Sequence, residues 1–188
     1  MSRYFPHTAY AEDQPLARTI LTVHVLARGY TAGAVVGLGA SAVGGLYTRI
    51  RGAKAASPAP LTTTLRSARL LRSTGTASAV GLGLMGIALA GRMRGRDDIE
   101  WRDRAWRLMA NEGQLETDDW TYGGATTGLL AAAATPRMRA VGGLRAVAGA
   151  AGLGSVAGTV GYLVWRYGVH GRKHAEYAVV DEAALSDL

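Results

Sequence analysis

Four stretches of the chain carry no charged side chain, and they alternate with segments that are rich in charge. They cover residues 29–48, 73–91, 120–135 and 146–165, which are 20, 19, 16 and 20 residues long. A helix needs about 20 predominantly apolar residues to cross a bilayer, with a range of roughly 17–25. Three stretches meet that length directly. We expect the short third one to begin in the acidic segment before it or to tilt less. The pattern therefore predicts four transmembrane helices.

Small residues recur at every fourth position within each stretch. This spacing is typical of helices whose backbones approach closely in a membrane. In water each glycine would cost a helix about 1 kcal/mol relative to alanine, whereas lipid enforces helical hydrogen bonding. The pattern thus favours a membrane protein over a soluble, flexible Gly/Ala-rich chain. The residues that we expect at helix–helix contacts are Gly33, Gly37, Ser41, Gly83, Gly124, Gly128, Gly154 and Gly158.

Two stretches carry further glycines away from their main stripe. These residues predict a second helical neighbour for each stretch, from another protein, because a small residue on a second face allows a second close contact. They are Gly39 and Gly44 in the first stretch, and Gly149, Gly152 and Gly161 in the fourth.

The sequence as a whole predicts an all-α membrane protein in three parts. A four-span membrane domain covers 29–165, between an N-terminal segment (1–28) and a polar tail (166–188) that we expect to be extended or disordered. Asp13 and Pro15 are typical of a helix start. An amphipathic helix is expected to follow and to run into the first span. Arg28, at the head of that span, is expected to reach the membrane surface.

The segment between the second and third stretches predicts one short surface helix over residues 97–110. Acidic residues precede basic ones by four positions three times, which is the favoured orientation on a helix. We expect this helix to lie at the membrane interface or against a partner, with Trp101 and Trp106 at headgroup level. A solvated loop helix is the alternative.

Charge divides the flanking segments into two groups. The connections between the first and second stretches and between the third and fourth carry +9 with no acid, whereas all other flanking segments together carry −2. Basic segments stay on the cytoplasmic or matrix side. We therefore expect both termini and residues 92–119 on the opposite side. This placement also accounts for the net charge of +7 without nucleic acid as a partner.

Three arginines, Arg66, Arg69 and Arg72, precede the second stretch at three-residue spacing. All three can reach phosphate from one side of a helix, and each basic residue at an anionic surface contributes about 1 kcal/mol. We expect them to bind the headgroup of an anionic phospholipid.

No residue pattern indicates catalysis. The chain has no cysteine, which excludes thiol chemistry and zinc–thiolate sites. Gly81, Gly83 and Gly86 fit a dinucleotide fingerprint, but that motif requires a preceding strand, and here it lies within a hydrophobic stretch. His170 and His174 are one helical turn apart in a basic segment, where a solvated pair is favoured over a metal site. We expect no cofactor, no metal and no enzymatic activity.

Gly123–Gly124–Ala–Thr–Thr–Gly128 follows an acidic run at the start of the third stretch. With four glycine-rich spans and basic loops, this segment resembles the signature of the mitochondrial inner-membrane preprotein translocase family. The likeness covers roughly residues 28–165. Where that signature has an Arg and an Asp upstream, this chain has Glu112 and Glu116.

The whole chain, from MSRYFPHTAYAEDQPLAR to its acidic tail, looks like a fungal version of one branch of that family, a four-helix accessory subunit of respiratory complex I. The resemblance implies a multi-pass protein of the mitochondrial inner membrane, with both termini in the intermembrane space. It also implies a non-catalytic role in assembling the membrane arm, with other membrane-arm subunits and a phospholipid such as cardiolipin as partners. The first residues lack a cleavable signal, so any organellar address is expected to be internal. A channel-type translocase subunit remains the alternative.

Overall fold

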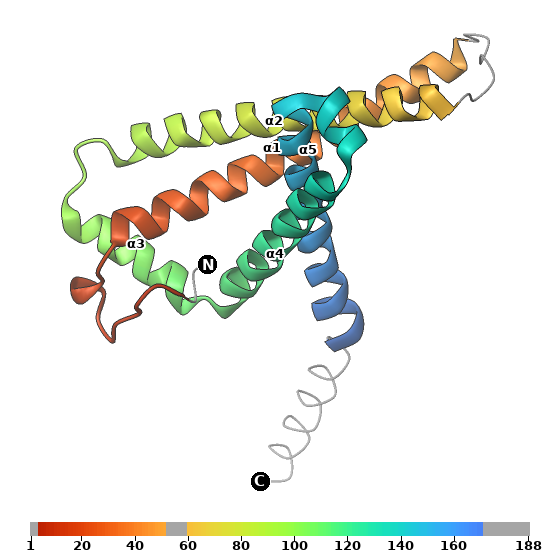
Figure 1. Ribbon diagram of the computed structural model, residues 1–188. Helices are drawn as coiled ribbons and strands as arrows, with labels where there is room; N and C mark the ends of the chain where they lie inside the picture. The colour runs from red at the N-terminus through yellow and green to blue at the C-terminus, as the bar shows by residue number, and fades with distance from the viewer. Residues whose placement is uncertain (1–3, 52–59, 171–188) are drawn as a thin grey trace.

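All regular elements in the described residues, 4–51 and 60–170, are helical (Figure 1). In the computed structural model a short 3-10 turn, η2 (Ala11–Asp13), precedes five α-helices, and a π-helical turn ends the described chain. This confirms the predicted all-α class for these ranges. The five helices and the final turn are α1 (Ala17–Ile50), α2 (Pro60–Met93), α3 (Asp98–Ala110), α4 (Glu112–Ala134), α5 (Pro136–Leu163) and η3 (Val164–His170). Our expectations for most of the polar tail, His174 included, lie outside the described residues.

The first helix begins later than Asp13 and Pro15 predicted. Leu16 has a positive φ of 54°, which no helical residue adopts, so α1 begins at Ala17. The buried Gln14 holds this turn, because its amide donates a hydrogen bond of 2.7 Å to the Pro6 carbonyl. From Ala17 the helix runs without interruption into the first uncharged stretch, as the sequence predicted.

Three helical segments in the described residues are long and apolar enough to cross a membrane. They are Ala17–Thr48, Ser67–Met93 and Gly143–Val169. They include the first, second and fourth predicted spans. Helix α4 is not among them, because acidic residues occupy its first two turns and leave an apolar part too short to qualify.

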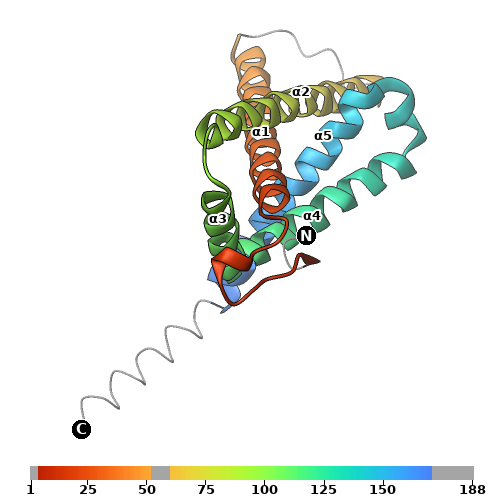
Figure 2. The same ribbon diagram turned by 90° about the vertical axis from the view of Figure 1, so that its left-hand side faces the viewer.

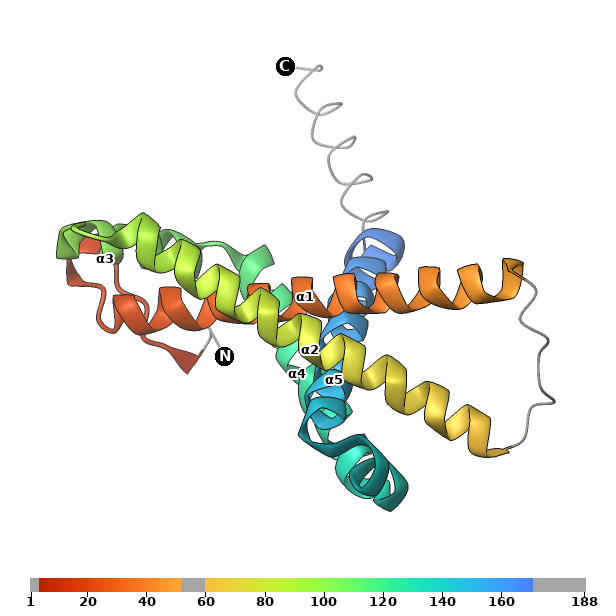
Figure 3. The same cartoon turned by 90° about the horizontal axis from the view of Figure 1, so that it is seen from above.

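Two helical pairs make up the body of the molecule, α1 with α2 and α4 with α5. Seen from above, the α1–α2 pair crosses the pair formed by α4 and α5 (Figure 3). The pairs are joined where α2 packs against α5. There Gly75 lies on the Arg145 carbonyl, and Gly149 lies on the carbonyl of Leu71. A Cβ at either glycine would overlap backbone atoms of the other helix.

Helix α5 bends near its start. Gly143 has φ 61° and ψ −170°, a backbone conformation that is essentially restricted to glycine. The bend separates a short initial helix, which begins at Pro136, from the long segment that follows. The long segment packs into the bundle, beginning near the buried Ala146.

Helix α3 lies beside the first turns of α1 and the N-terminal segment (Figure 2). Its apolar face is covered from within the chain, because Ala105 and Met109 are buried against Ala17 and Ile20 of α1. The helix itself confirms the prediction for 97–110, with all three expected i, i+4 ion pairs in place. The apolar face of α3 therefore packs against α1, and a position of this helix at the membrane interface stays a prediction.

Candidate functional site

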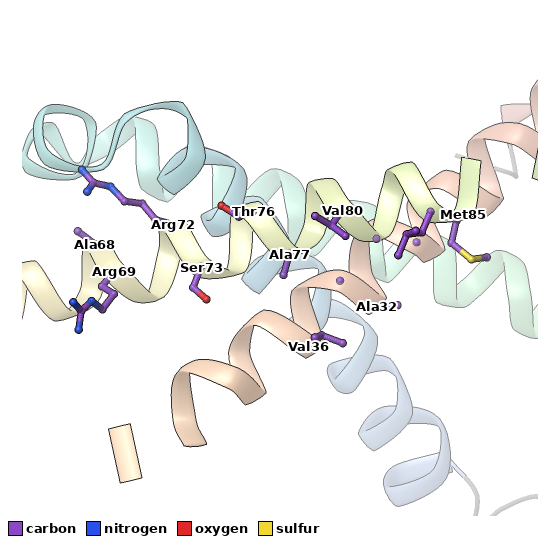
Figure 4. Close-up of a pocket in the computed structure, with 14 residues that line it drawn as sticks. Ala32, Val36, Ala68, Arg69, Arg72, Ser73, Thr76, Ala77, Val80 and Met85 are labelled. Carbon is purple, nitrogen blue, oxygen red and sulfur yellow. The ribbon is translucent and has the colours of Figure 1, made fainter. Parts of the chain in front are cut away.

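A long groove lies between α1 and α2. Its volume is about 1210 Å³, and its walls are mostly apolar. Val80, Leu84 and Met85 of α2 line one end, and Arg69 and Arg72 line the other (Figure 4). Two of the three arginines expected to bind a headgroup thus border one cavity. The side chain of Arg66 lies outside the described residues.

A buried carboxylate joins α1 to α4. Asp118 is 1% exposed. Its Oδ2 is 2.8 Å from Nδ1 of His24, and its Oδ1 is 3.0 Å from a guanidinium nitrogen of Arg28. The same nitrogen of Arg28 donates to Oε1 of Gln114 at 3.0 Å. Arg28 therefore pairs within the protein, and its position at the membrane surface stays a prediction.

A second acidic residue joins α4 to α5 and η3. Oε2 of Glu116 accepts hydrogen bonds from the Tyr162 hydroxyl at 3.0 Å and from Arg166 at 2.7 Å. The rings of Trp120, Tyr162 and Trp165 lie against one another, with centroids 5.9–6.5 Å apart. Acidic, basic and aromatic groups thus close one end of the α4–α5 pair.

Hydroxyl groups connect the helices further inside. Thr31 of α1 donates to Oγ of Ser155 in α5 at 3.2 Å, and Thr121 of α4 lies 2.8 Å from Thr159 of α5. Each of these four hydroxyls also bonds to a backbone carbonyl of its own helix, three or four residues earlier. Backbone carbonyls therefore satisfy these hydroxyls, and their arrangement is typical of helix packing in an apolar medium.

Six of the eight residues expected at helix contacts lie where two backbones meet. Gly33 lies on the Ala77 carbonyl, and a Cβ on Gly37 would be 2.7 Å from Cα of Thr74. Between α4 and α5, Gly124 and Gly154 lie on each other's carbonyls. The other two of the six pack in the same way, Gly128 on the carbonyl of Ala150 and Gly158 on the carbonyl of Trp120.

Gly83 and Ser41 do not fit that pattern. Nothing lies within 4 Å of a Cβ on Gly83. The face of α2 that meets α1 contains Ala77 and Gly81. Gly83 stands two residues, or about 200°, further around the helix, so its expected helix contact is a wrong prediction. Ser41 is only partly buried, and the next stripe residue, Gly45, faces open space.

The glycines off the main stripes divide into two groups. Gly149 and Gly152 of α5 pack against α2, which supplies their second neighbour from the same chain. Gly161 contacts the Trp120 ring. The expectation of an external partner at these three positions is therefore wrong. In α1, by contrast, Gly39 and Gly44 have no atom within 4 Å of a Cβ.

The two tryptophans of α3 contact the N-terminal part of the chain. The Trp106 indole donates to the Thr8 carbonyl at 2.9 Å, and the guanidinium of Arg18 lies 5.6 Å from the Trp101 ring. Both rings are half-buried. Their position at lipid headgroups stays a prediction.

Sequence reasoning missed the ion pairs of Asp118. The sequence did contain a signal, because basic groups precede the first uncharged stretch and an acidic group precedes the third. His24 and Arg28 are spaced four residues apart just before the first uncharged stretch, and Asp118 stands just before the third. Opposite charges at the same depth in a membrane attract strongly, since water is scarce there.

The arrangement is that of a small, glycine-packed helical protein with three helices able to cross a membrane. Within the described ranges no group of three or more His, Asp or Glu side chains is placed to hold a metal ion. The chain belongs to a family described as "Protein of unknown function (DUF1757)", whose model matches residues 8–163. No curated protein and no solved structure matches it.

Proposed function

We propose that this protein is a non-catalytic accessory subunit that assembles and stabilises the membrane arm of mitochondrial NADH:ubiquinone oxidoreductase. The open face of α1 indicates that the helices have protein neighbours in the membrane. The likeness to the complex I branch of the translocase family indicates which complex supplies them.

The observation that carries the proposal is the open face of α1. Gly39 allows a backbone to approach, and no described residue lies within 4 Å of a Cβ there. Val43, which is 68% exposed, and Leu46, which is 59% exposed, lie within about 40° of Gly39 around the helix. Small residues flanked by larger apolar ones are typical of helix–helix interfaces in membranes. This face suits a transmembrane helix of another subunit.

In this proposal α4 also crosses the membrane, as the third of four spans along the chain. Its apolar part, residues 120–134, is about 22 Å long as a helix, which is less than the roughly 30 Å hydrocarbon core. The preceding turns extend it, because two of the acids there are paired. Asp118 bonds to Arg28 and His24, and Glu116 bonds to Arg166. Four spans place both termini in the intermembrane space and the basic connections in the matrix.

The translocase alternative requires a surface for positively charged presequences. The groove between α1 and α2 is apolar and has Arg69 and Arg72 at one end, so it would repel such a segment. The acids that would attract one, Asp118 and Glu116, are already paired with basic residues. These observations favour the structural role.

A pair of variants tests the proposal in cells that express the protein. Gly39→Leu places a large side chain on the open face without touching the chain's own helices. Gly83→Leu makes the same change at an open position of α2, away from this face. We expect Gly39→Leu to lower the assembled membrane arm and NADH-linked respiration severalfold, whereas Gly83→Leu leaves both unchanged. Native gels of mild extracts, probed for the protein and for complex I, provide the measurement.

Protein import separates the two functions. Loss of the protein should leave import of presequence-bearing precursors intact while complex I assembly falls. If import fails first and complex I still assembles, the translocase hypothesis replaces the proposal. If Gly39→Leu assembles like the wild type, the face of α1 contacts lipid rather than a subunit.

A further inference from the structure

The groove between α1 and α2 changes in chemistry along its length. At one end are the guanidinium groups of Arg69 and Arg72, followed by the hydroxyls of Ser73 and Thr76. Beyond Ala77 the α2 wall is hydrocarbon (Figure 4). The order from cationic through hydroxylic to apolar matches the order of phosphate, ester and acyl chain in a phospholipid.

The groove also has the depth of one leaflet. The uncharged part of α2, residues 73–91, is about 28 Å long as a helix, close to the hydrocarbon thickness of roughly 30 Å. Arg72 therefore lies at the edge of the hydrocarbon, where headgroups begin. From Ser73 to Met85 the wall runs about 18 Å, and one leaflet of acyl chains is roughly 15 Å deep. A partner helix that crossed the roughly 30 Å hydrocarbon core would extend well past the ends of this groove.

We infer that this groove binds one anionic phospholipid, with its headgroup at the end lined by Arg69 and Arg72 and an acyl chain along Val80 and Leu84. The α1 wall of the groove suits a lipid acyl chain rather than a third helix. Its glycines, Gly29 and Gly33, already lie against α2, so no small-residue stripe is left there for a third backbone. The inference shares the membrane placement of the proposed function but does not depend on the complex.

Photo-crosslinking of the full chain in vesicles tests this site. Benzoylphenylalanine at Leu84 reports on the groove, and the same group at Ile87, which is 72% exposed and outside the groove, reports on bulk lipid. The vesicles contain phosphatidylcholine with a minor fraction of cardiolipin. After illumination, the mass of each adduct identifies the lipid. We expect the Leu84 adduct to be enriched in cardiolipin and the Ile87 adduct to match the bulk ratio.

A matched pair of arginine variants tests the headgroup contact. The double variant Arg69→Gln/Arg72→Gln removes two charges, each contributing about a fivefold preference, so enrichment at Leu84 should fall by up to about thirty-fold. Arg92→Gln/Arg94→Gln removes two exposed arginines at and just beyond the other end of α2, away from the groove, and should leave enrichment unchanged.

Other results would contradict the lipid site, the membrane placement or the headgroup contact, as follows. Bulk-ratio adducts at both positions would refute the lipid site but leave the membrane placement intact. Absence of lipid adducts at both positions would refute the membrane placement and the proposed function with it. Loss of enrichment on adding inorganic phosphate would reassign the arginines to free phosphate. In mitochondrial membranes, a protein adduct at Leu84 would reassign the groove to a partner helix.

Discussion

Replacing Asp118 with alanine should destabilise the protein more than any other single change to an acidic side chain. The carboxylate is 1% exposed and contacts both His24 and Arg28. Removing one partner of a buried ion pair typically costs 3–5 kcal/mol, because the remaining charge is left buried without compensation. The Arg28 side chain is 27% exposed and keeps its bond to Gln114. We therefore expect the lower part of that range, about 3 kcal/mol.

Unfolding of the purified chain in mixed micelles, titrated with sodium dodecyl sulfate and followed by tryptophan fluorescence, measures this loss. The control is Asp103→Ala, which removes an ion pair with Arg107 whose side chains are 40% and 73% exposed. Exposed pairs contribute about 0–1 kcal/mol. Asp118→Asn keeps an acceptor for His24 and should fall between the two. If Asp118→Ala unfolds at the same detergent fraction as Asp103→Ala, the buried pair does not hold α1 to α4.

Other variants check separate contacts. Gly37→Leu should separate α1 from α2 and lower the amount of folded protein severalfold. Gly39→Leu, whose site is open, should leave the isolated chain folded. Equal yields of folded protein for the two variants would contradict the helix contact at Gly37. Tyr162→Phe should weaken the tie between α4 and α5 by about 1 kcal/mol, the usual net contribution of one hydrogen bond, as measured by the same detergent titration; no shift would mean that Arg166 alone satisfies Glu116. Protease added to mitoplasts should remove both terminal segments, and protection of either one would contradict four spans.

Local patterns predicted the helices well but the contacts between them only in part. The four-residue spacing of Gly33 and Gly37 marks a face that can pack closely, and that face does meet α2. The same spacing failed at Gly83, because α2 has two neighbours and uses different faces for them. Gly75 meets α5, whereas the face containing Ala77 and Gly81 meets α1. Which stripe of small residues forms a contact depends on the angle at which two helices cross, and the sequence of one helix alone does not determine that angle.

The polar site was the least accessible to sequence reasoning. Arg28 and Asp118 are separated by 90 positions, and each alone looks like a charge at the edge of an uncharged stretch. Their pairing depends on how α5 places α4 relative to α1, since α1 and α4 make few backbone contacts of their own. The arginines at the groove were easier to find. Arg69 and Arg72 owe their common position to helical periodicity alone.

The pairing of neighbouring helices limits the order in which the contacts of this chain can form during synthesis. Helices α1 and α2 follow each other in the chain and close on their own glycines, as do α4 and α5. Each pair therefore needs only helices that are adjacent in the sequence. The contact between Gly75 and the Arg145 carbonyl, with Gly149 on the Leu71 carbonyl, joins the early pair to the late pair. This joint between α2 and α5 can form only after the last helix of the bundle has been synthesised.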